Sequence, residues 1–391
     1  MASLKTNKIR EPKTRLINKL VIVGNGFDLA LGLKTKYEDF LFWYFKNFIV
    51  ESLKQKQVVR DRNGNDRYSH NQDDLFMFYN DTNYSFEENH ILGFMDNMDS
   101  YATIKNYILN GRHKFTYHFK SKLLKEIFDR SIRGWVDLES VYFDLLKKSF
   151  KNKNNNEIDE LNKDLSIIRE LLHKYLSQLD YSKTLQEDVA LKYNTQFSKD
   201  VSLDDISEYS YYGDEMETGH ILFLNFNYTE SLSNINNYLP NLFIKDDRSY
   251  EISHIQIHGS VKYGSNSLIF GYGDEMDKDY KNIEELNDNK YFENIKSFKY
   301  LQDKAYSGIL QYIDAEEYQI VIYGHSCGLS DRVLLNELFE HKNCKSIKIY
   351  YYNKQEFINK TMDISRHFNS NQLMRKKIVA FNYDDVIPQT T

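Results

Sequence analysis

The chain of 391 residues is poor in the residues that interrupt helices or cross-link folds. Its 3 prolines and 16 glycines favour long helices and argue against an all-β fold. Its two cysteines, Cys327 and Cys344, cannot form a structural zinc site by themselves or a disulfide framework, so a reducing cytoplasm is the expected compartment. No apolar run approaches the ~20 residues that a membrane-spanning helix needs. We therefore expect neither a resident metal nor a membrane partner.

The chain also lacks an excess of charge of one sign. Its 51 basic and 57 acidic residues give a net charge of −6, so nucleic acid is not an expected partner. The first 18 residues are polar and mostly basic, without the apolar core of a signal peptide, and are expected to be a flexible tail (1–18). The length and the apolar content of 41% are sufficient for a full hydrophobic core.

What the chain does contain is a set of short, continuous apolar runs, which are typical of strands buried on both faces of a sheet. These runs lie at Leu20–Val23, His220–Phe226, Ile252–Ile257, Ser267–Phe270, Tyr318–Tyr323, Ile347–Tyr352 and Lys377–Phe381. Helical patterns, such as Asp331–Glu340 and Lys354–Phe368, lie between them. The alternation predicts an α/β fold with a doubly wound, mostly parallel, Rossmann-like sheet.

Residues 43–218 follow a helical period instead, so we predict a large, mainly helical insertion after the first strand. The sheet domain would then comprise residues 19–42 and 219–391. Within the insertion, the charged stretch Gln55–Asp74 is predicted to be a loop. Two apolar stripes are predicted to pack in a core: Trp135, Leu138, Val141, Tyr142, Leu145 and Leu146, and Leu165, Ile168, Leu171, Leu172, Tyr175 and Leu179.

A glycine turn, Gly24-Asn25-Gly26-Phe27, follows the first predicted strand. Such a turn between a strand and a helix offers backbone N–H groups to phosphate, so phosphate binding is predicted here. The turn departs from the usual dinucleotide pattern, because its next glycine, Gly32, comes six residues after Gly26 instead of three. Asp28 either contacts the ligand or caps the helix.

Polar residues also end the second and third strands of the predicted sheet. Asn225 and Asn227 alternate onto one face at the edge where open α/β sheets bind ligands. Alternatively, these asparagines and Thr229 cap the next helix. His258, before Gly259, is placed to act as a base or has a structural role.

The segment Gly324–Gly328 after a later strand has two interpretations. Gly-x-Ser-x-Gly is the nucleophile elbow of α/β-hydrolases, with Ser326 as the nucleophile. That fold needs an acid and a histidine on separate loops, whereas Asp363 and His367 lie on one predicted helix. The other interpretation is a second phosphate- or ribose-binding turn, with Ser330 or Asp331 capping the helix that follows.

The segment from Gly24 to Phe40 resembles the opening motif of the abortive-infection AbiH family of bacterial phage-defence proteins. Later motifs of that family are matched, in order, by Trp135–Glu139, Phe226–Thr229, Ile257–Gly259 and Gly324–Ser326. The resemblance spans about Lys19 to Asp331 and implies a role in antiviral defence.

More remotely, the same segments are similar to sirtuin-like NAD-consuming domains. There, a Gly-x-Gly turn with a further glycine eight residues after the first holds the NAD phosphates, matching Gly24, Gly26 and Gly32. An asparagine at the scissile nicotinamide–ribose bond is matched by Asn227, and the base of a His-Gly segment by His258. The turn on the adenosine side is matched by Gly324-His325-Ser326.

The departures from that pattern limit what the resemblance implies. Asn225 replaces a threonine and Thr229 an aspartate. An expected arginine and the four-cysteine zinc module are missing. NAD hydrolysis or nucleotide binding is therefore implied in place of protein deacetylation.

The resulting hypothesis is a cytoplasmic defence effector with NAD as its substrate. Asn227 orients water or the ribose, and His258, titrating near neutrality, accepts the proton. The NAD-binding residues would be Gly24, Asn25, Gly26, Phe27, Asp28, Asn225, Gly324, His325, Ser326 and Asp331. Control until infection implies a homo-oligomer or a regulatory protein partner at the insertion. The alternatives are a non-catalytic NAD- or ADP-ribose-binding module, a serine hydrolase using Ser326, and an unrelated toxin such as a nuclease.

Overall fold

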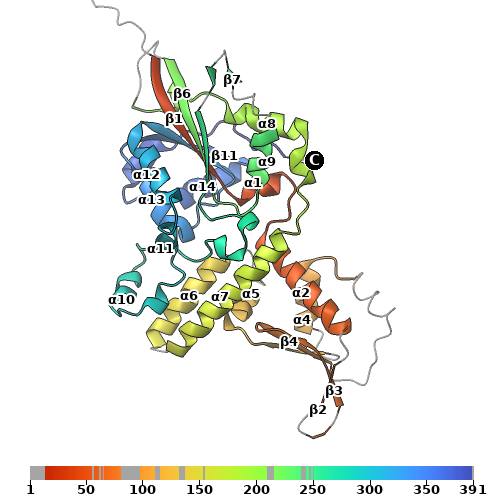
Figure 1. Ribbon diagram of the computed structural model, residues 1–391. Helices are drawn as coiled ribbons and strands as arrows, with labels where there is room; N and C mark the ends of the chain where they lie inside the picture. Colours follow the sequence, from red (N-terminus) through yellow and green to blue (C-terminus); the bar gives the residue numbers. More distant parts are fainter. Residues whose placement is uncertain are drawn as a thin grey trace, which may run out of the picture.

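The computed structural model describes residues 14–54, 57–60, 63–64, 66–80, 97–110, 115–131, 137–152, 155–208, 215–238, 244–245, 248–249 and 251–389. The predicted tail up to residue 13, and Trp135 and Val136 of one motif, lie outside these ranges. Figure 1 shows two lobes, one built on a large sheet and one built mainly of helices. We call them the sheet lobe and the helical lobe.

The sheet lobe contains five strands, all parallel, in the order β11-β10-β1-β6-β9. Their bounds are β1 Thr14–Val23, β6 Glu215–Asn225, β9 Glu251–Gln256, β10 Tyr318–Tyr323 and β11 Cys344–Tyr350. The chain passes from the central strand β1 to β6 and β9 on one side, and then to β10 and β11 on the other. Strand order therefore reverses at β1, which is where open α/β sheets bind ligands.

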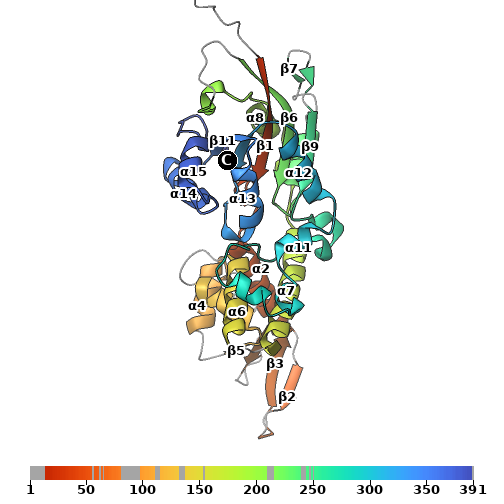
Figure 2. The ribbon, with the colours of Figure 1, turned by 90° about the vertical axis from the view of Figure 1, so that its left-hand side faces the viewer.

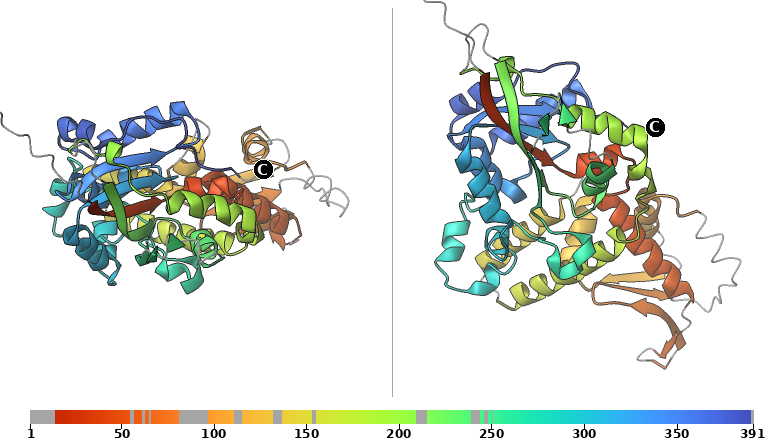
Figure 3. Two further views of the ribbon diagram at one scale, coloured as in Figure 1. Left: turned by 90° about the horizontal axis from the view of Figure 1, so that it is seen from above. Right: turned by 45° about the horizontal axis from the view of Figure 1, so that its top comes forward.

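Helices lie on both sides of this sheet, as Figures 2 and 3 show. Leu20 and Ile22 of β1 face a core shared with α12 (Ala305–Ala315) and α13 (Arg332–Glu340). Val21 and Val23 face the opposite core, to which α1 (Asn25–Ala30), α8 (Glu187–Phe197) and α9 (Ser231–Tyr238) contribute. Because both faces are covered, β10 and the second halves of β1 and β6 are buried throughout, and the predicted Rossmann-like α/β fold is confirmed.

Two predicted strands are wrong. Ser267–Phe270 follows a 3-10 turn at Ser265–Ser267 and is irregular, and Lys377–Phe381 begins at the last residue of α15 (Asn371–Lys377). Leu268 and Phe270 are nevertheless buried, and Ile378 forms only an isolated bridge with Ile347. Short apolar runs in irregular segments can thus be buried like strands, which periodicity alone does not distinguish.

The start of the first strand also differs from the prediction. β1 begins at Thr14, which pairs with Glu215 of β6, so residues 14–18 belong to the sheet and not to a flexible tail. The prediction missed this part of β1 because Thr14–Leu16 are exposed or half-buried, so they do not continue the buried apolar run.

The helical lobe lies between β1 and β6 in the sequence. Its helices are α2 Tyr37–Lys54, α4 Tyr101–Asn110, α5 Lys122–Ser131, α6 Leu138–Asn152 and α7 Asn155–Leu176. It also has an antiparallel sheet of β2 Gln57–Arg60, β3 Asp66–Gln72, β4 Phe76–Asn80 and β5 Phe115–Phe119. The predicted loop at Gln55–Asp74 is therefore wrong, because it contains β2 and β3; polar antiparallel strands give little periodic signal.

The two predicted apolar stripes, within the residues described, pack against α2 in one core; Leu138, Tyr142, Leu165 and Ile168 are buried there. The α8 helix precedes β6 but packs on the central sheet, where Phe197 contacts Phe223. The remaining elements are the ribbon β7 Ile244–Lys245 and β8 Arg248–Ser249, and α10 Tyr280–Glu284, α11 Lys296–Tyr300 and α14 Lys354–Ser365. Among the described helices, none is both long and apolar enough to cross a membrane.

Candidate functional site

A cavity of about 310 Å³ lies at the carboxyl edge of the central sheet. Its walls come from the turns after β1, β6, β9 and β10, and from α6 and α7 of the helical lobe. This volume is at the lower end of the ~300–1,000 Å³ typical of small-molecule sites. The predicted site residues that line it are Gly24, Asn25, Gly26, Asp28, Asn227, His258, Gly324, His325, Ser326 and Asp331.

Two predicted ligand-binding residues, Phe27 and Asn225, are fully buried and are not among the residues lining the cavity. The Phe27 ring packs edge-on against Tyr193 and Tyr323 in the sheet core. The Asn225 side-chain oxygen accepts from the backbone N–H of Asn227 at 3.0 Å. Both residues support the turns from behind, and neither lines the cavity.

The backbone of the glycine turn is not free to hold a phosphate as predicted. The N–H of Gly24 donates to Tyr323 at 3.2 Å, that of Gly26 to Gly324 at 2.8 Å, and that of Phe27 to Gly24 at 2.9 Å. Three of the four N–H groups in Gly24–Phe27 are therefore already used within the protein.

Gly24 and Gly26 lack side chains, which allows two backbone turns to approach each other closely. A Cβ on Gly24 would lie 2.4 Å from the His325 Cα, and one on Gly26 would lie 2.7 Å from the Gly324 oxygen. Gly324 itself has a φ of 73°, which favours glycine. The turns after β1 and β10 thus pack directly on each other at the point where strand order reverses.

Gly26→Ala is expected to destabilise the protein by about 1–3 kcal/mol, the usual cost of overpacking. The added Cβ would meet backbone atoms of Gly324, which cannot rotate away. Denaturant unfolding measures the loss. Gly308→Ala in α12 is the control, because the nearest atom to its Cβ would be Ile255 Cδ1 at 3.5 Å and alanine favours a helix. Equal stability of the two variants would contradict this explanation.

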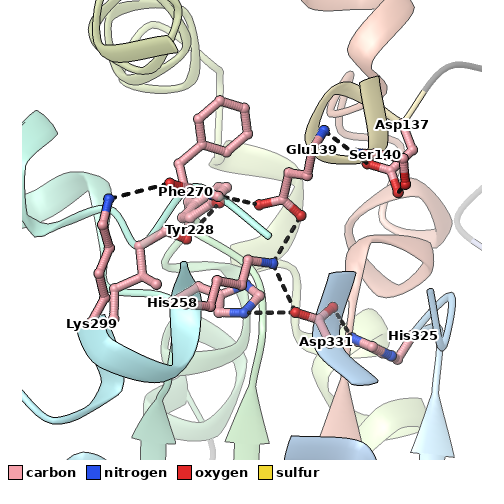
Figure 4. Close-up of polar contacts among 12 residues, drawn as sticks. Asp137, Glu139, Ser140, Tyr228, His258, Phe270, Lys299, His325 and Asp331 are labelled. Atoms are coloured by element: carbon pink, nitrogen blue, oxygen red, sulfur yellow. Dashed lines mark hydrogen bonds and ion pairs between the residues drawn. The ribbon is translucent and has the colours of Figure 1, made fainter. Parts of the chain in front are cut away.

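On the buried side of the cavity, Asp331 connects several charged or titratable groups (Figure 4). Its Oδ1 accepts from Lys296 Nζ at 2.8 Å and lies 3.1 Å from His258 Nε2, while its Oδ2 lies 3.6 Å from His325 Nε2. Lys296, only 1% exposed, also donates to Glu139 Oε2 of α6 at 2.8 Å. A buried chain of ion pairs therefore joins the helical lobe to the edge of the sheet.

Burial and pairing together set the charges of this chain of ion pairs. Burial raises the pKa of Glu139 to about 7, although Lys296 opposes the rise. Burial also disfavours ionisation of Asp331, but Lys296 and His258 hold the pKa of Asp331 well below its ordinary value. Burial disfavours the charged form of Lys296, yet Asp331 and Glu139 raise the pKa of Lys296. Asp331 and Lys296 are thus both ionised at neutral pH.

His258 is held in place by its own backbone and by Asp331. The next residue, Gly259, has a φ of 76°, and a Cβ there would lie 1.8 Å from the Ser267 oxygen, so the His-Gly pair is required for this tight segment. The ring nitrogen Nε2 lies 3.1 Å from the Tyr300 hydroxyl as well as from Asp331. An aspartate in this position fixes the ring and stabilises an imidazolium when one forms.

Burial, reinforced by Lys296, lowers the pKa of His258 to about 4. The prediction that His258 titrates near neutrality is therefore wrong, since desolvation and a buried cation both disfavour the imidazolium. The ring is uncharged at pH 7, which leaves it able to accept a proton.

Asn227 and Asp28 complete the polar lining. Asn227 Nδ2 donates to the Gly24 oxygen at 3.1 Å, so its contact is with the β1 turn and not with the start of α9. Asp28 is inside α1, whose N-cap is Gly24, so the N-cap alternative for Asp28 is wrong. Its carboxylate accepts from the hydroxyls of Thr229 and Ser231, and burial raises the pKa of Asp28 to about 6.

The predicted partners for a Ser326 nucleophile do not converge on it. Asp363 pairs with Arg366, and His367 Nε2 lies 2.8 Å from the Cys327 oxygen. The placement of Asp363 and His367 therefore does not supply the acid–histidine pair that the nucleophile elbow requires.

In the other interpretation, Asp331 is expected to cap the next helix. It makes no side-chain capping bond to α13.

Sequence reasoning missed Lys296 and Tyr300, which lie outside every motif. Glu139 did belong to a motif, but nothing in the sequence indicated its partner. In the part of the chain that is described, no group of three or more His, Cys, Asp or Glu residues is arranged to hold a metal ion.

A parallel sheet with helices on both faces and a polar cavity where strand order reverses defines a Rossmann-like α/β protein with a candidate ligand site at its carboxyl edge. Residues 20–353 match the family described as bacteriophage abortive infection AbiH. The chain belongs to this family, which gives it a role in bacterial defence against phage. No curated protein matches it.

Proposed function

We propose that this chain hydrolyses NAD at the nicotinamide–ribose bond as its effector chemistry in abortive infection. The main support is the pairing of His258 with an ionised Asp331 on the wall of the cavity that Asn227 also lines. These are the positions to which the sirtuin-like resemblance assigns the base and the asparagine.

In this reaction, water and NAD give nicotinamide, ADP-ribose and a proton. The bond between the ribose C1′ and the nicotinamide nitrogen breaks, and its electron pair neutralises the cationic ring, so this leaving group needs no acid. The water oxygen bonds to C1′, and its proton passes to His258. Asp331 then stabilises the imidazolium.

The carboxylates of the cavity support the same chemistry. Asp28, Glu139 and Asp331 all line it and are nearly fully buried. Negative charge placed beforehand in a partly desolvated site stabilises a ribose that becomes cationic as the bond breaks. Glu139 belongs to the helical lobe, so a partner that shifts this lobe would also shift a carboxylate of the cavity. We therefore expect an activating partner or a second copy to bind the helical lobe.

The direct test measures NAD and ADP-ribose after incubating purified protein with NAD, with and without lysate of phage-infected cells. We expect NAD to be converted to ADP-ribose and nicotinamide in equal amounts. Infected cells that stop growing with their NAD intact would contradict the proposal.

Asn227→Ser is expected to reduce NAD cleavage roughly a hundredfold, because a small misplacement of the reacting groups is expensive in the transition state. Its loss of stability should be only ~0.5–1.5 kcal/mol, from the hydrogen bond to Gly24. Asn343→Ser is the control: it loses side-chain bonds to the backbone oxygens of Ile313 at 2.9 Å and Asp314 at 3.2 Å, before β11 at the opposite edge of the sheet. Thermal unfolding and NAD depletion are measured on both, and a fully active Asn227→Ser protein would remove this residue from the mechanism.

A further inference from the structure

Charges of opposite sign line the cavity at different depths. The carboxylates Asp28, Glu139 and Asp331 are 1%, 6% and 7% exposed. The lysines that line the cavity, Lys36 and Lys360, are exposed and half-buried, respectively. Among the exposed or half-buried lining residues, we call Asn25, Thr35, Lys36, Ser326 and Lys360 the rim.

The rim is built from four segments, which two hydrogen bonds join in pairs. Asn25 of α1 donates to the Thr35 oxygen at 3.1 Å, which fixes the loop that carries Lys36. Lys360 of α14 donates to the Ser326 oxygen at 2.9 Å, which holds its ammonium group beside the turn after β10. An ammonium group has three donors, so this one bond leaves Lys360 able to bind an anion.

Two further carboxylates line the cavity, and both are engaged at helix starts. Asp137 accepts from the Glu139 N–H at 3.0 Å and from the Ser140 hydroxyl at 2.8 Å at the start of α6. Glu356 accepts from the Tyr352 N–H at 2.9 Å at the start of α14. The positive end of each helix offsets these charges, so they oppose an anion at the rim less than free carboxylates would.

The glycine turn leaves little backbone for phosphate, because three of its N–H groups already have partners. A phosphate beside the glycine turn must then be held mainly by side chains, and Lys36 and Lys360 are the lysines that line the cavity. We infer that Lys36 and Lys360 form the phosphate subsite, so that a nucleotide binds with its phosphates at the rim and a cationic base toward the buried carboxylates.

This inference rests on the proposed function and deepens it by naming the ligand class. A nucleotide with a positive base and a negative pyrophosphate matches both ends of the cavity, as oxidised NAD does. Reduced NADH has no positive ring and should therefore bind more weakly than NAD at equal phosphate charge.

The test compares NAD with nicotinamide riboside, which has the same cationic base and ribose but no phosphate. Calorimetric binding is measured for the wild type, Lys36→Gln and Lys360→Gln. Each variant should weaken NAD binding roughly ten- to hundredfold, the usual effect of losing a hydrogen bond to a charged group, and leave riboside binding within about twofold. Lys34→Gln is the control, because Lys34 is exposed in the same loop but does not line the cavity.

Each result decides something. Unchanged NAD binding in both variants, an equal loss for the riboside, or an equal loss in Lys34→Gln would overturn the phosphate subsite. Failure of the wild type to bind NAD would overturn the subsite and the hydrolase proposal together. Wild-type binding without cleavage, weakened by the two variants, would support the subsite and contradict the hydrolase. Cleavage of NAD with an unaltered KM in both variants would support the hydrolase and contradict the phosphate subsite.

Discussion

His258→Ala is expected to lower the rate of NAD cleavage by roughly 10²–10⁴, the usual contribution of a general base. The titration of His258 itself should not lower the wild-type rate between about pH 8 and pH 5, because burial lowers the pKa of His258 to about 4 and the ring remains able to accept a proton throughout that range. A fall in rate near pH 6–7 would instead report protonation of Asp28 and Glu139, whose pKa values burial raises to about 6 and about 7. A histidine with an ordinary pKa would lose activity near pH 6.5.

The measurement is the initial rate of ADP-ribose formation across that pH range, together with thermal unfolding. His254→Ala is the matched control: it lies on β9, the strand that leads to His258, its ring contacts Ser233 at 3.3 Å, and it does not line the cavity. A His258→Ala protein that is folded and fully active would exclude His258 as the base.

Lys296→Met is expected to cost about 3–5 kcal/mol of unfolding free energy, because it leaves Glu139 and Asp331 buried without their shared cation. In the wild type, the pKa of Asp331 is lowered, so the stability from its pairing is present above the ordinary aspartate pKa and is lost as pH falls through the folded value. In the variant, acid protonates the unpaired carboxylates, so its deficit relative to the wild type should shrink as pH falls.

Denaturant unfolding at several pH values checks this result. Lys290→Met is the control, since Lys290 pairs with Asp159 at 2.7 Å where the two side chains are 50% and 55% exposed. An exposed ion pair contributes less than about 1 kcal/mol to the free energy of unfolding, so Lys290→Met should change stability little. Adding Glu139→Gln to Lys296→Met should recover part of the loss. If Lys296→Met costs no more than Lys290→Met, the buried chain of ion pairs does not stabilise the junction of the lobes.

The sheet could be predicted because its strands are buried on both faces, which leaves a continuous apolar run such as Tyr318–Tyr323. The glycine turn could be located but not interpreted. Gly24 and Gly26 lack side chains so that another backbone can approach, and the sequence does not show whether that neighbour is a phosphate or the turn at Gly324.

The charges of the site could not be predicted from the sequence for another reason. Lys296 is separated from Glu139 by 157 positions and from Asp331 by 35, and only the packing of the two lobes brings them together. The pKa of His258 depends on that same lysine and on burial. Predicting His258 as a candidate base was possible from its position after a strand, whereas its ionisation depended on residues that no motif included.

The central position of β1 has a consequence for synthesis on the ribosome. Val23, at the end of β1, pairs with Asn225 on one side and Tyr323 on the other. During synthesis, β1 therefore has no neighbour in its sheet until β6 has been made, and it gains the second only after β10. Domains generally fold from the N-terminus during translation, and distant pairings form slowly. The helices of the helical lobe can therefore assemble before the sheet does. The cavity cannot form until Asp331, which lines it, has left the ribosome. A nascent chain is thus without its proposed reactive centre until Asp331 has been made.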